Sequence, residues 1–212
     1  MRTPLFIIGC GGFGREVFNI VQAVNSRQRQ WNVEAFVDDR PSDQDLQRVS
    51  ALGSGYIGTV ETLAQHSGPF SALVAVGDAA ARANIVGKLA NALVAFPVLL
   101  HPEATLGPDV IVGPGSIVAA GARLSANIIV GQHVQIDQNA TVGHDSHIGD
   151  FARLNPQACV SGSVAVGTRS LIGANATVLQ GLCIGDGAVV GAAACVVHNV
   201  ANETTVKGVP AR

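Results

Sequence analysis

The sequence predicts an α/β unit followed by a parallel β-helix built from hexapeptides, and two features support this prediction. From Leu106 to Val196 every sixth residue is aliphatic without exception. Near the N-terminus a short apolar run leads into a glycine-rich turn and then an amphipathic segment. A period of six fits neither an α-helix nor a plain strand. It fits short strands joined by corners, three strands to each coil of a prism.

Each position of the hexapeptide has an expected role in that prism. The aliphatic residue points inward, and the small or apolar residue two positions earlier packs beside it. The next residue after the aliphatic one is most often Gly, which we expect to turn the corner with a positive φ. Cys159, Cys183 and Cys195 directly precede inward positions and should face outward. Together with Cys10 they show no disulfide or metal spacing, which favours free thiols in a cytoplasmic protein.

Composition and charge exclude several classes of protein. The 212 residues carry a formal net charge of -2, which argues against a surface for nucleic acid. The longest apolar run, residues 93–100, is far short of the roughly 20 residues that a membrane span needs. Residues 5–8 are too few for a signal peptide, and Arg15 and Glu16 follow closely. We therefore expect neither nucleic-acid binding nor membrane insertion.

The first hundred residues alternate between strand and helix patterns, which predicts a parallel sheet with right-handed crossovers. A polar segment through Arg48 is expected to be poor in helix. We place the domain boundary at His101–Pro102, giving a half-Rossmann-like domain over 1–101 and a β-helix domain over 102–212 with a short tail from Asn202. Strands are expected over 4–8, 34–37, 72–76 and 94–100, and helices after Gly14, over 60–65 and from 79 to about 93, the last capped by Asp78.

The glycine-rich turn over residues 9–14 joins the first strand to the first helix as in a dinucleotide-binding fingerprint. Such a loop offers backbone N–H groups and the positive end of a helix dipole to a diphosphate. Asp38 and Asp39 end the second strand, where an acid that binds ribose would lie. Equally, the glycines could serve only tight packing of strand and helix. Because the unit is half of a full dinucleotide fold, a nucleotide diphosphate attached to another group suits it better than NAD.

Motifs spread over the whole chain share one resemblance. They are residues 8–16, residues 36–39, Gly58, residues 75–78 with Arg82, His101–Pro102, residues 142–149 and residues 207–212. In these the chain resembles the bacterial sugar acyltransferases of the sialic acid O-acetyltransferase (NeuD-type) family, which includes the nucleotide-aminosugar N-acetyltransferases of glycan biosynthesis. The resemblance implies a left-handed β-helix, a homotrimer with active sites between subunits, acetyl-CoA as co-substrate without a metal, and a nucleotide sugar bound by the N-terminal domain.

His144 is the candidate general base, since acyl transfer to an amine or hydroxyl requires a group that takes the nucleophile's proton. It lies two residues after the inward Val142, at a corner, so its ring should project outward. The adjacent Asp145 can accept from one ring nitrogen and leave the other basic. The resemblance assigns the other roles: Gly162 to the oxyanion, Ala174 and Lys207 to acetyl-CoA, and Gly9, Gly11, Gly12, Asp38, Asp39 and Gly58 to the substrate.

Two positions depart from the family pattern. The aminosugar enzymes usually carry Asn seven residues before the base, where this chain has Asp137, and often His nine residues after it, where this chain has Arg153. Asp137 could hold an ammonium acceptor, and Arg153 a carboxylate or phosphate. We expect the acceptor to be the amine of a nucleotide-linked aminosugar, since free sialic acid has neither diphosphate nor ribose. The alternative is O-acetylation of sialic acid or a related sugar hydroxyl.

Two other functions compete with this interpretation. His133, His144 and His147 suggest a γ-class carbonic anhydrase, but two residues rather than four separate the last pair. A nucleotide-sensing or scaffold protein would not need His144, Asp145, Gly162 and the Lys207 tail together. A trimer is also expected because outward apolar or small residues need cover; they are Ile117, Ile129, Cys159, Cys183 and Val189.

Overall fold

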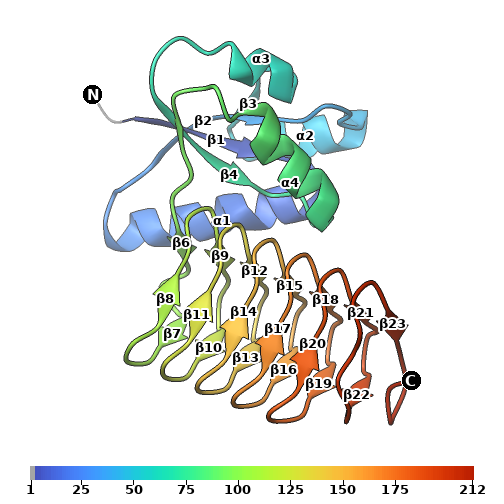
Figure 1. Cartoon of the computed structure of the whole chain (residues 1–212). Coiled ribbons are helices and arrows are strands. Elements are labelled where there is room, and N and C mark those ends of the chain that lie inside the picture. Colours follow the sequence, from blue (N-terminus) through green and yellow to red (C-terminus); the bar gives the residue numbers. More distant parts are fainter. Residues whose placement is uncertain (1–2) are drawn as a thin grey trace. The chain divides into compact units, whose positions relative to one another are not determined.

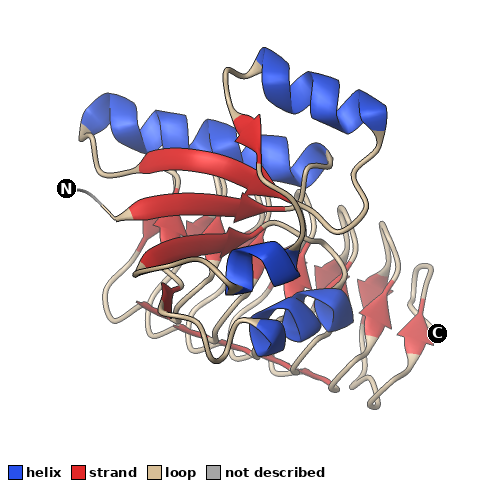
Figure 2. Cartoon of the chain, turned by 90° about the horizontal axis from the view of Figure 1, so that it is seen from above, coloured by secondary structure: helices blue, strands red, loops and turns tan. Residues whose placement is uncertain are grey.

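The computed structural model describes residues 3–212, which form two compact units, the first extending to Pro97 and the second spanning Val98–Arg212. The first is a parallel sheet of strand order β3-β2-β1-β4-β5, with helices on both faces (Figures 1 and 2). Among the described residues, none of the helices combines the length and apolar character needed to cross a membrane. The elements are β1 (Pro4–Ile8), α1 (Gly12–Arg27), β2 (Asn32–Val37), α2 (Asp43–Ala51), β3 (Gly55–Tyr56), α3 (Val60–Ala64), β4 (Phe70–Val74), α4 (Ala79–Lys88) and β5 (Val94–Ala95).

The strand order reverses between β1 and β4, because the chain first adds β2 and β3 on one side of β1 and then β4 and β5 on the other. In doubly wound sheets, ligands bind beyond the carboxyl ends of the strands at such a switch point. The core residues Phe6, Ile8, Phe70 and Val74 on β1 and β4 are almost fully buried. The buried strands hold the glycine-rich loop at this edge of the sheet.

The segment before Arg48 differs from the sequence prediction, because α2 forms where little helix was expected. Ser42 caps it, its hydroxyl accepting from the Asp45 N–H at 3.1 Å, and Arg48 lies in its last turn. These are ordinary helix-start and helix-end signals. The prediction was wrong because α2 is short and predominantly polar, and Val49 is its one buried side chain.

The strand predicted over residues 94–100 is divided between the two units. β5 pairs with β4 through Val94 and Ala95, whereas Leu99 and Leu100 pair with Ile117 and Val118 in the second unit. Pro97 lies between them and has no N–H to donate to a sheet. The expected boundary at 101–102 lies four residues beyond this division.

The second unit is the left-handed parallel β-helix, with three sheets of two-residue strands (Figure 1). The six-stranded sheet holds β7 (Thr105–Leu106), β10 (Arg123–Leu124), β13 (Thr141–Val142), β16 (Cys159–Val160), β19 (Thr177–Val178) and β22 (Cys195–Val196). The five-stranded sheet holds β8 (Ile111–Val112), β11 (Ile129–Val130), β14 (His147–Ile148), β17 (Ala165–Val166) and β20 (Cys183–Ile184). The seven-stranded sheet holds β6 (Leu99–Leu100), β9 (Ile117–Val118), β12 (Gln135–Ile136), β15 (Arg153–Leu154), β18 (Leu171–Ile172), β21 (Val189–Val190) and β23 (Thr205–Val206).

The hexapeptide prediction is confirmed by the interior of the prism. Strands pair with those 18 residues away, so Leu124, Val142 and Val160 stack in successive coils. The inward aliphatic residues and their small neighbours form one continuous buried core. Cys159 and Cys183 are exposed and Cys195 is half-buried, as expected for residues that precede inward positions. Ile117, in contrast, is only 1% exposed within the single chain, so it needs no cover from another subunit.

The glycines that follow the inward residues have a different role from the one expected. Positive φ angles occur two positions later, for example at His133, Asp145 and Ala193. At Gly149, a Cβ atom would lie 2.6 Å from the backbone nitrogen of Thr168 in the next coil. These glycines are therefore required by the close approach of successive coils rather than by their own φ.

The coil continues beyond Val196, where the sequence pattern was expected to end. Val200 bridges to Ile184, and Val206 pairs with Val190, so the last coil has 16 residues instead of 18. The shorter coil shifts the period by two residues, so a fixed step of six along the sequence does not reveal it.

We expect Gly149→Ala to destabilise the β-helix by about 2–3 kcal/mol, because the added Cβ overlaps with the backbone of the next coil. The matched variant is Gly181→Asn, at a corner with φ +72°, where a Cβ atom would meet no other atom within 4 Å and Asn tolerates the left-handed conformation. Urea denaturation of both variants checks this. Equal midpoints for the two would contradict the explanation.

Candidate active site

His144 and Asp145 form a hydrogen-bonded pair at the corner between the six-stranded and five-stranded sheets. His144 Nδ1 lies 2.7 Å from Asp145 Oδ2, and Asn127, one coil earlier, donates from Nδ2 to Asp145 Oδ1 at 3.1 Å. Asp145 has φ +58°, which turns its carboxylate back toward the ring that precedes it. The His144 side chain is 64% exposed, so substrates can reach it.

Gly162 lies one coil after His144, directly against the imidazole ring. A Cβ at this position would approach His144 Nε2 to 2.7 Å, so only glycine leaves room for the ring. Nδ1 is held by Asp145, so Nε2, the nitrogen beside Gly162, is the one available to take a proton. The structure thus brings together His144, the candidate base, with Asp145 and the backbone of Gly162.

Asp137 and Arg153 form an ion pair with each other. Arg153 donates from Nε and Nη2 to Asp137 Oδ2, at 3.1 and 2.8 Å. The Asp137 side chain is 2% exposed and that of Arg153 is 20% exposed. Sequence reasoning treated the two as separate contacts for the acceptor and missed this pair, although their 16-residue separation brings them into adjacent coils.

The remaining β-helix candidates lie at a different edge of the prism. Asp137, Ala174 and Lys207 follow strands of the seven-stranded sheet (β12, β18 and β23), whereas His144 and Gly162 follow strands of the six-stranded sheet. The Lys207 backbone exchanges hydrogen bonds with Arg212, both at 3.1 Å, which folds the end of the chain back on itself. One prism therefore carries the candidate residues on two of its edges.

The glycines of the loop before α1 divide into two groups. Gly9 has φ +117° and an added Cβ would lie 2.6 Å from the Ala75 oxygen; a Cβ on Gly14 would overlap with the Gly9 carbonyl. These two serve packing. Around Gly11 there is open space, and Gly12 meets only the Arg15 guanidinium at 3.9 Å. Gly11 caps α1 without a side chain, and its first turn holds no acid, as suits an anion.

Asp38 and Asp39 are engaged in the fold around this loop. Asp38 accepts from the Cys10 N–H at 2.8 Å and from the Arg40 N–H at 2.9 Å. Asp39 accepts from the Val60 N–H at 2.8 Å and pairs with Lys88 at 3.3 Å. Both carboxylates fasten the carboxyl end of β2 to its neighbours. Gly58, with φ +117°, accepts from the Asp38 N–H at 3.1 Å.

A pocket of about 230 Å³ opens at the carboxyl ends of β1, β2 and β4. Gly9, Asp38 and Asp39 border it, and Val60, Val76 and Ile85 give it an apolar wall. Buried Arg82 donates to the carbonyls of Val76 and Gly77, at 2.7 and 3.1 Å, and fixes the loop after β4. Sequence reasoning missed most of the lining, including Arg40 and, on α4, Ala81, Asn84 and Ile85. The spacing of Ala81, Asn84 and Ile85 along one helix face was the available signal.

Two further groups have no catalytic geometry. Burial, reinforced by the charge of Asp38, raises the pKa of the Cys10 thiol to about 12, so this cysteine is protonated and a poor nucleophile. His133 is 2% exposed and stacks on Phe151, with ring centroids 5.2 Å apart. Over residues 3–212, no three His, Cys, Asp or Glu side chains converge as a metal site.

The chain is similar to a known protein family and to several solved structures. Residues 4–89 match the family described as the PglD N-terminal domain. The acetyltransferase domain of PglB from Neisseria gonorrhoeae, solved with acetyl coenzyme A, is 33% identical with a TM-score of 0.90, over 100% of this chain and 99% of that one. PerB from Caulobacter crescentus, solved with CoA and GDP-perosamine, is 29% identical with a TM-score of 0.87, over 99% and 96%. WeeI from Acinetobacter baumannii is 25% identical with a TM-score of 0.85, over 99% of both chains. A comparison with curated protein sequences gave no significant match.

The fold and the site together define a hexapeptide-repeat acyltransferase with an N-terminal α/β unit. The chain belongs to the PglD/NeuD-type family of sugar N-acetyltransferases, which confirms the resemblance found in the sequence.

The pKa of the Asp145 carboxyl is lowered from its ordinary value of 3.8, first by the hydrogen bond with His144 and second by that from Asn127. We therefore expect His144→Ala to raise this pKa toward 3.8, while the Asn127 bond holds it slightly below. Carbon NMR of the Asp145 carboxyl during an acid titration measures the change. His147→Ala, three residues along, is the control and should leave it unmoved. No shift in His144→Ala would show that the pair does not form in solution.

Proposed function

We propose that this chain transfers the acetyl group of acetyl-CoA to the amino group of a nucleotide-linked aminosugar in bacterial glycan biosynthesis. The observation that carries the proposal is the His144 ring, oriented by Asp145, with its free nitrogen beside Gly162. The relatives support the substrates: one structure contains acetyl coenzyme A, and another contains CoA with GDP-perosamine.

The reaction begins with proton transfer to His144. Nδ1 keeps its proton and donates a hydrogen bond to the Asp145 carboxylate. Nε2 takes a proton from the acceptor amine as the amine nitrogen bonds to the thioester carbon. The resulting imidazolium is stabilised by the carboxylate. As the carbon–sulfur bond breaks, the imidazolium returns the proton and CoA leaves as the thiol. Atoms and charges balance without a metal or a covalent acyl-enzyme.

Gly162 is proposed to stabilise the oxyanion formed when the amine attacks the thioester. Its backbone lies against the base, and a backbone N–H aimed at developing negative charge is typical of acyl-transfer sites. The requirement for glycine also has a local reason, because any side chain here would displace the His144 ring.

The nucleotide is proposed to bind at the carboxyl edge of the N-terminal sheet. The diphosphate meets the N–H groups near Gly11 and Gly12, and the nucleoside occupies the pocket walled by Val60, Val76 and Ile85. Asp38 and Asp39 would hold the backbone of this site in place as well as contact the ligand, since their carboxylates already accept hydrogen bonds from backbone N–H groups.

The ion pair between Asp137 and Arg153 changes how these residues contribute to the acceptor site. Because Arg153 already neutralises Asp137, an ammonium acceptor would have to compete with a guanidinium that donates two hydrogen bonds to Asp137 Oδ2. Support for an amine acceptor therefore comes from the nucleotide-binding loop and the relatives rather than from Asp137. O-acetylation of a sialic acid or related sugar remains the alternative that the substrate test addresses.

We further propose that the chain acts as a homotrimer in the cytoplasm. His144 and Gly162 lie at one edge of the prism and Ala174 and Lys207 at another, so a site between neighbouring prisms would combine both sets. Ile111 and Ile129 stack on the five-stranded sheet with 63% and 50% exposure, as a surface covered by another subunit would. The cytoplasm supplies acetyl-CoA and keeps the exposed Cys159 and Cys183 reduced.

Replacing His144 by Ala should lower turnover by about two to four orders of magnitude, the usual contribution of a general base, with acetyl-CoA binding retained. Asp145→Ala should cost less, because the carboxylate only orients the ring. His147→Ala is the matched control and should keep near-normal turnover. Steady-state kinetics measure the turnover of the three variants. Near-full activity in His144→Ala would show that another residue is the base.

A panel of acceptors tests the substrate assignment. UDP-, GDP- and dTDP-linked 3-amino and 4-amino sugars, and free sialic acids, are each incubated with acetyl-CoA, and release of free CoA thiol is measured. We expect turnover with at least one nucleotide-linked amine and none with a free sialic acid. Acetylation of the free acid alone would overturn the proposal in favour of O-acetylation.

A further inference from the structure

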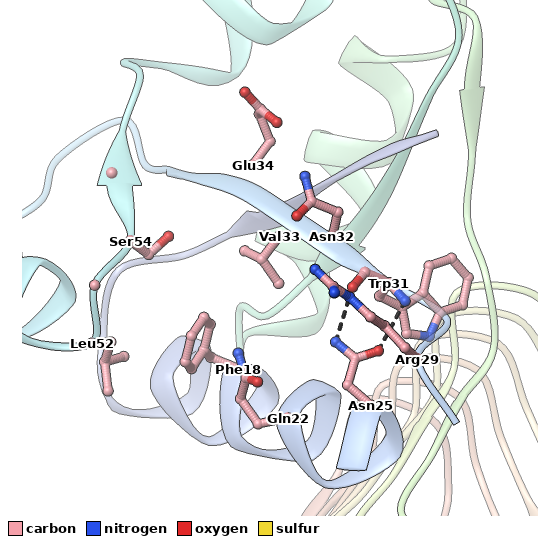
Figure 3. Close-up of a pocket in the computed structure, with 12 residues that line it drawn as sticks. Phe18, Gln22, Asn25, Arg29, Trp31, Asn32, Val33, Glu34, Leu52 and Ser54 are labelled. Carbon is pink, nitrogen blue, oxygen red and sulfur yellow. Dashed lines mark hydrogen bonds between the residues drawn. The ribbon is translucent and has the colours of Figure 1, made fainter. Parts of the chain in front are cut away.

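A second pocket, of about 390 Å³, lies in the N-terminal unit at the amino end of β2, between α1 and the connection from α2 to β3 (Figure 3). β1 and β2 run parallel, so this pocket and the glycine-rich loop lie at opposite ends of the sheet. β1 has five residues, and a strand of that length spans about 16 Å, which gives the separation of the two ends of the sheet. The proposed acetyl transfer uses no residue of this pocket.

The pocket exists because β3 is too short to cover β2. β3 pairs with β2 only at Ala35 and Phe36, and the preceding Gly53–Ser54 segment forms the far wall. The edge of β2 over Asn32–Glu34 therefore borders the pocket with backbone groups as well as side chains. A strand edge of this kind offers both N–H donors and carbonyl acceptors.

The rim of the pocket is held in place by one side chain. Asn25, on α1, donates from Nδ2 to the Trp31 carbonyl at 2.9 Å and accepts from the Trp31 N–H at 2.9 Å (Figure 3). It also accepts from the Gln30 N–H at 3.0 Å. These three bonds fix the turn that carries Arg29 and Trp31 beside the pocket. A preorganised rim reduces the entropy that a ligand must overcome.

Ser54 is the polar group that the fold leaves unused. Ser54 lines the pocket on the side opposite Arg29, and its Oγ atom is buried and has no hydrogen-bond partner within residues 3–212 (Figure 3). A buried hydroxyl without a partner is uncommon and calls for an explanation. A ligand hydroxyl, which both donates and accepts, would satisfy it.

The lining defines the chemistry of the ligand. Phe18, Val33 and Leu52 provide apolar surface, and Gln22 with Ser54 provides neutral hydrogen-bonding groups. Arg29 and Glu34 bring one positive and one negative charge, so the lining has no net charge to attract an ion of either sign. We propose that this pocket binds a neutral sugar, whose C–H face packs on the apolar side and whose hydroxyls meet the polar rim. The proposal does not rest on the acetyl-transfer assignment.

Trp31 makes the proposal directly testable, because it is the only tryptophan in the chain and it lines the pocket. The full chain is titrated with glucose, galactose and N-acetylglucosamine while tryptophan fluorescence is recorded. We expect a saturable change for at least one neutral sugar, with weaker responses to glucuronate and glucosamine. Ser54→Ala and Gln22→Ala should each weaken binding about five- to tenfold, as expected for one lost hydrogen bond. Both variants should keep normal acetyl transfer.

Three outcomes would overturn the proposal. A response that rises in proportion to sugar concentration without saturating would show an adventitious additive only. Unchanged midpoints in both variants would place the binding elsewhere. Competition by saturating nucleotide sugar would assign the signal to the carboxyl edge of the sheet, whereas an unchanged midpoint in its presence supports two separate sites.

Discussion

The 18-residue stacking of the β-helix is the constraint on which the candidate active site depends. Parallel hydrogen bonds and a continuous aliphatic core fix the spacing between coils, as in the stack of Leu124, Val142 and Val160. Before the shorter last coil, a corner residue consequently lies against the residue about 18 positions later. His144 meets Gly162 through this relation, so the environment of the base follows from the stacking of the whole prism rather than from a dedicated loop.

Left-handed corners add a second layer of order. Asn127, Asp145 and Ser163 occupy the same corner in successive coils with φ angles between 54° and 58°. Asn127 thereby comes within 3.1 Å of the Asp145 carboxylate that orients His144. Similar polar contacts recur at another corner, where Asp150 accepts from the Gln132 N–H and Asp186 from the Thr168 N–H. The contact between Asn127 and Asp145 is thus one of several polar contacts between successive coils, and it differs from the others in lying beside the exposed His144 ring.

The glycine-rich loop of the N-terminal unit contains glycines of two kinds. Gly9 and Gly14 are required because strand and helix backbones approach too closely for a Cβ, whereas Gly11 and Gly12 leave the start of α1 open. Close packing therefore explains Gly9 and Gly14, whereas Gly11 and Gly12 remain candidates for contact with a ligand. Asp38 accepts a hydrogen bond from the Cys10 N–H of this loop and also borders the pocket.

The sequence by itself determined the β-helix, the alternating α/β unit, the family and the His144–Asp145 pair, because each depends on local spacing or on adjacent residues. It missed α2, a short and predominantly polar helix with one buried residue, and the last coil, which is two residues shorter. The Asp137–Arg153 ion pair and the orphan hydroxyl of Ser54 were decided only by the tertiary structure. Both depend on which side chains meet between coils or across a short strand, and no periodicity along the chain encodes those distances.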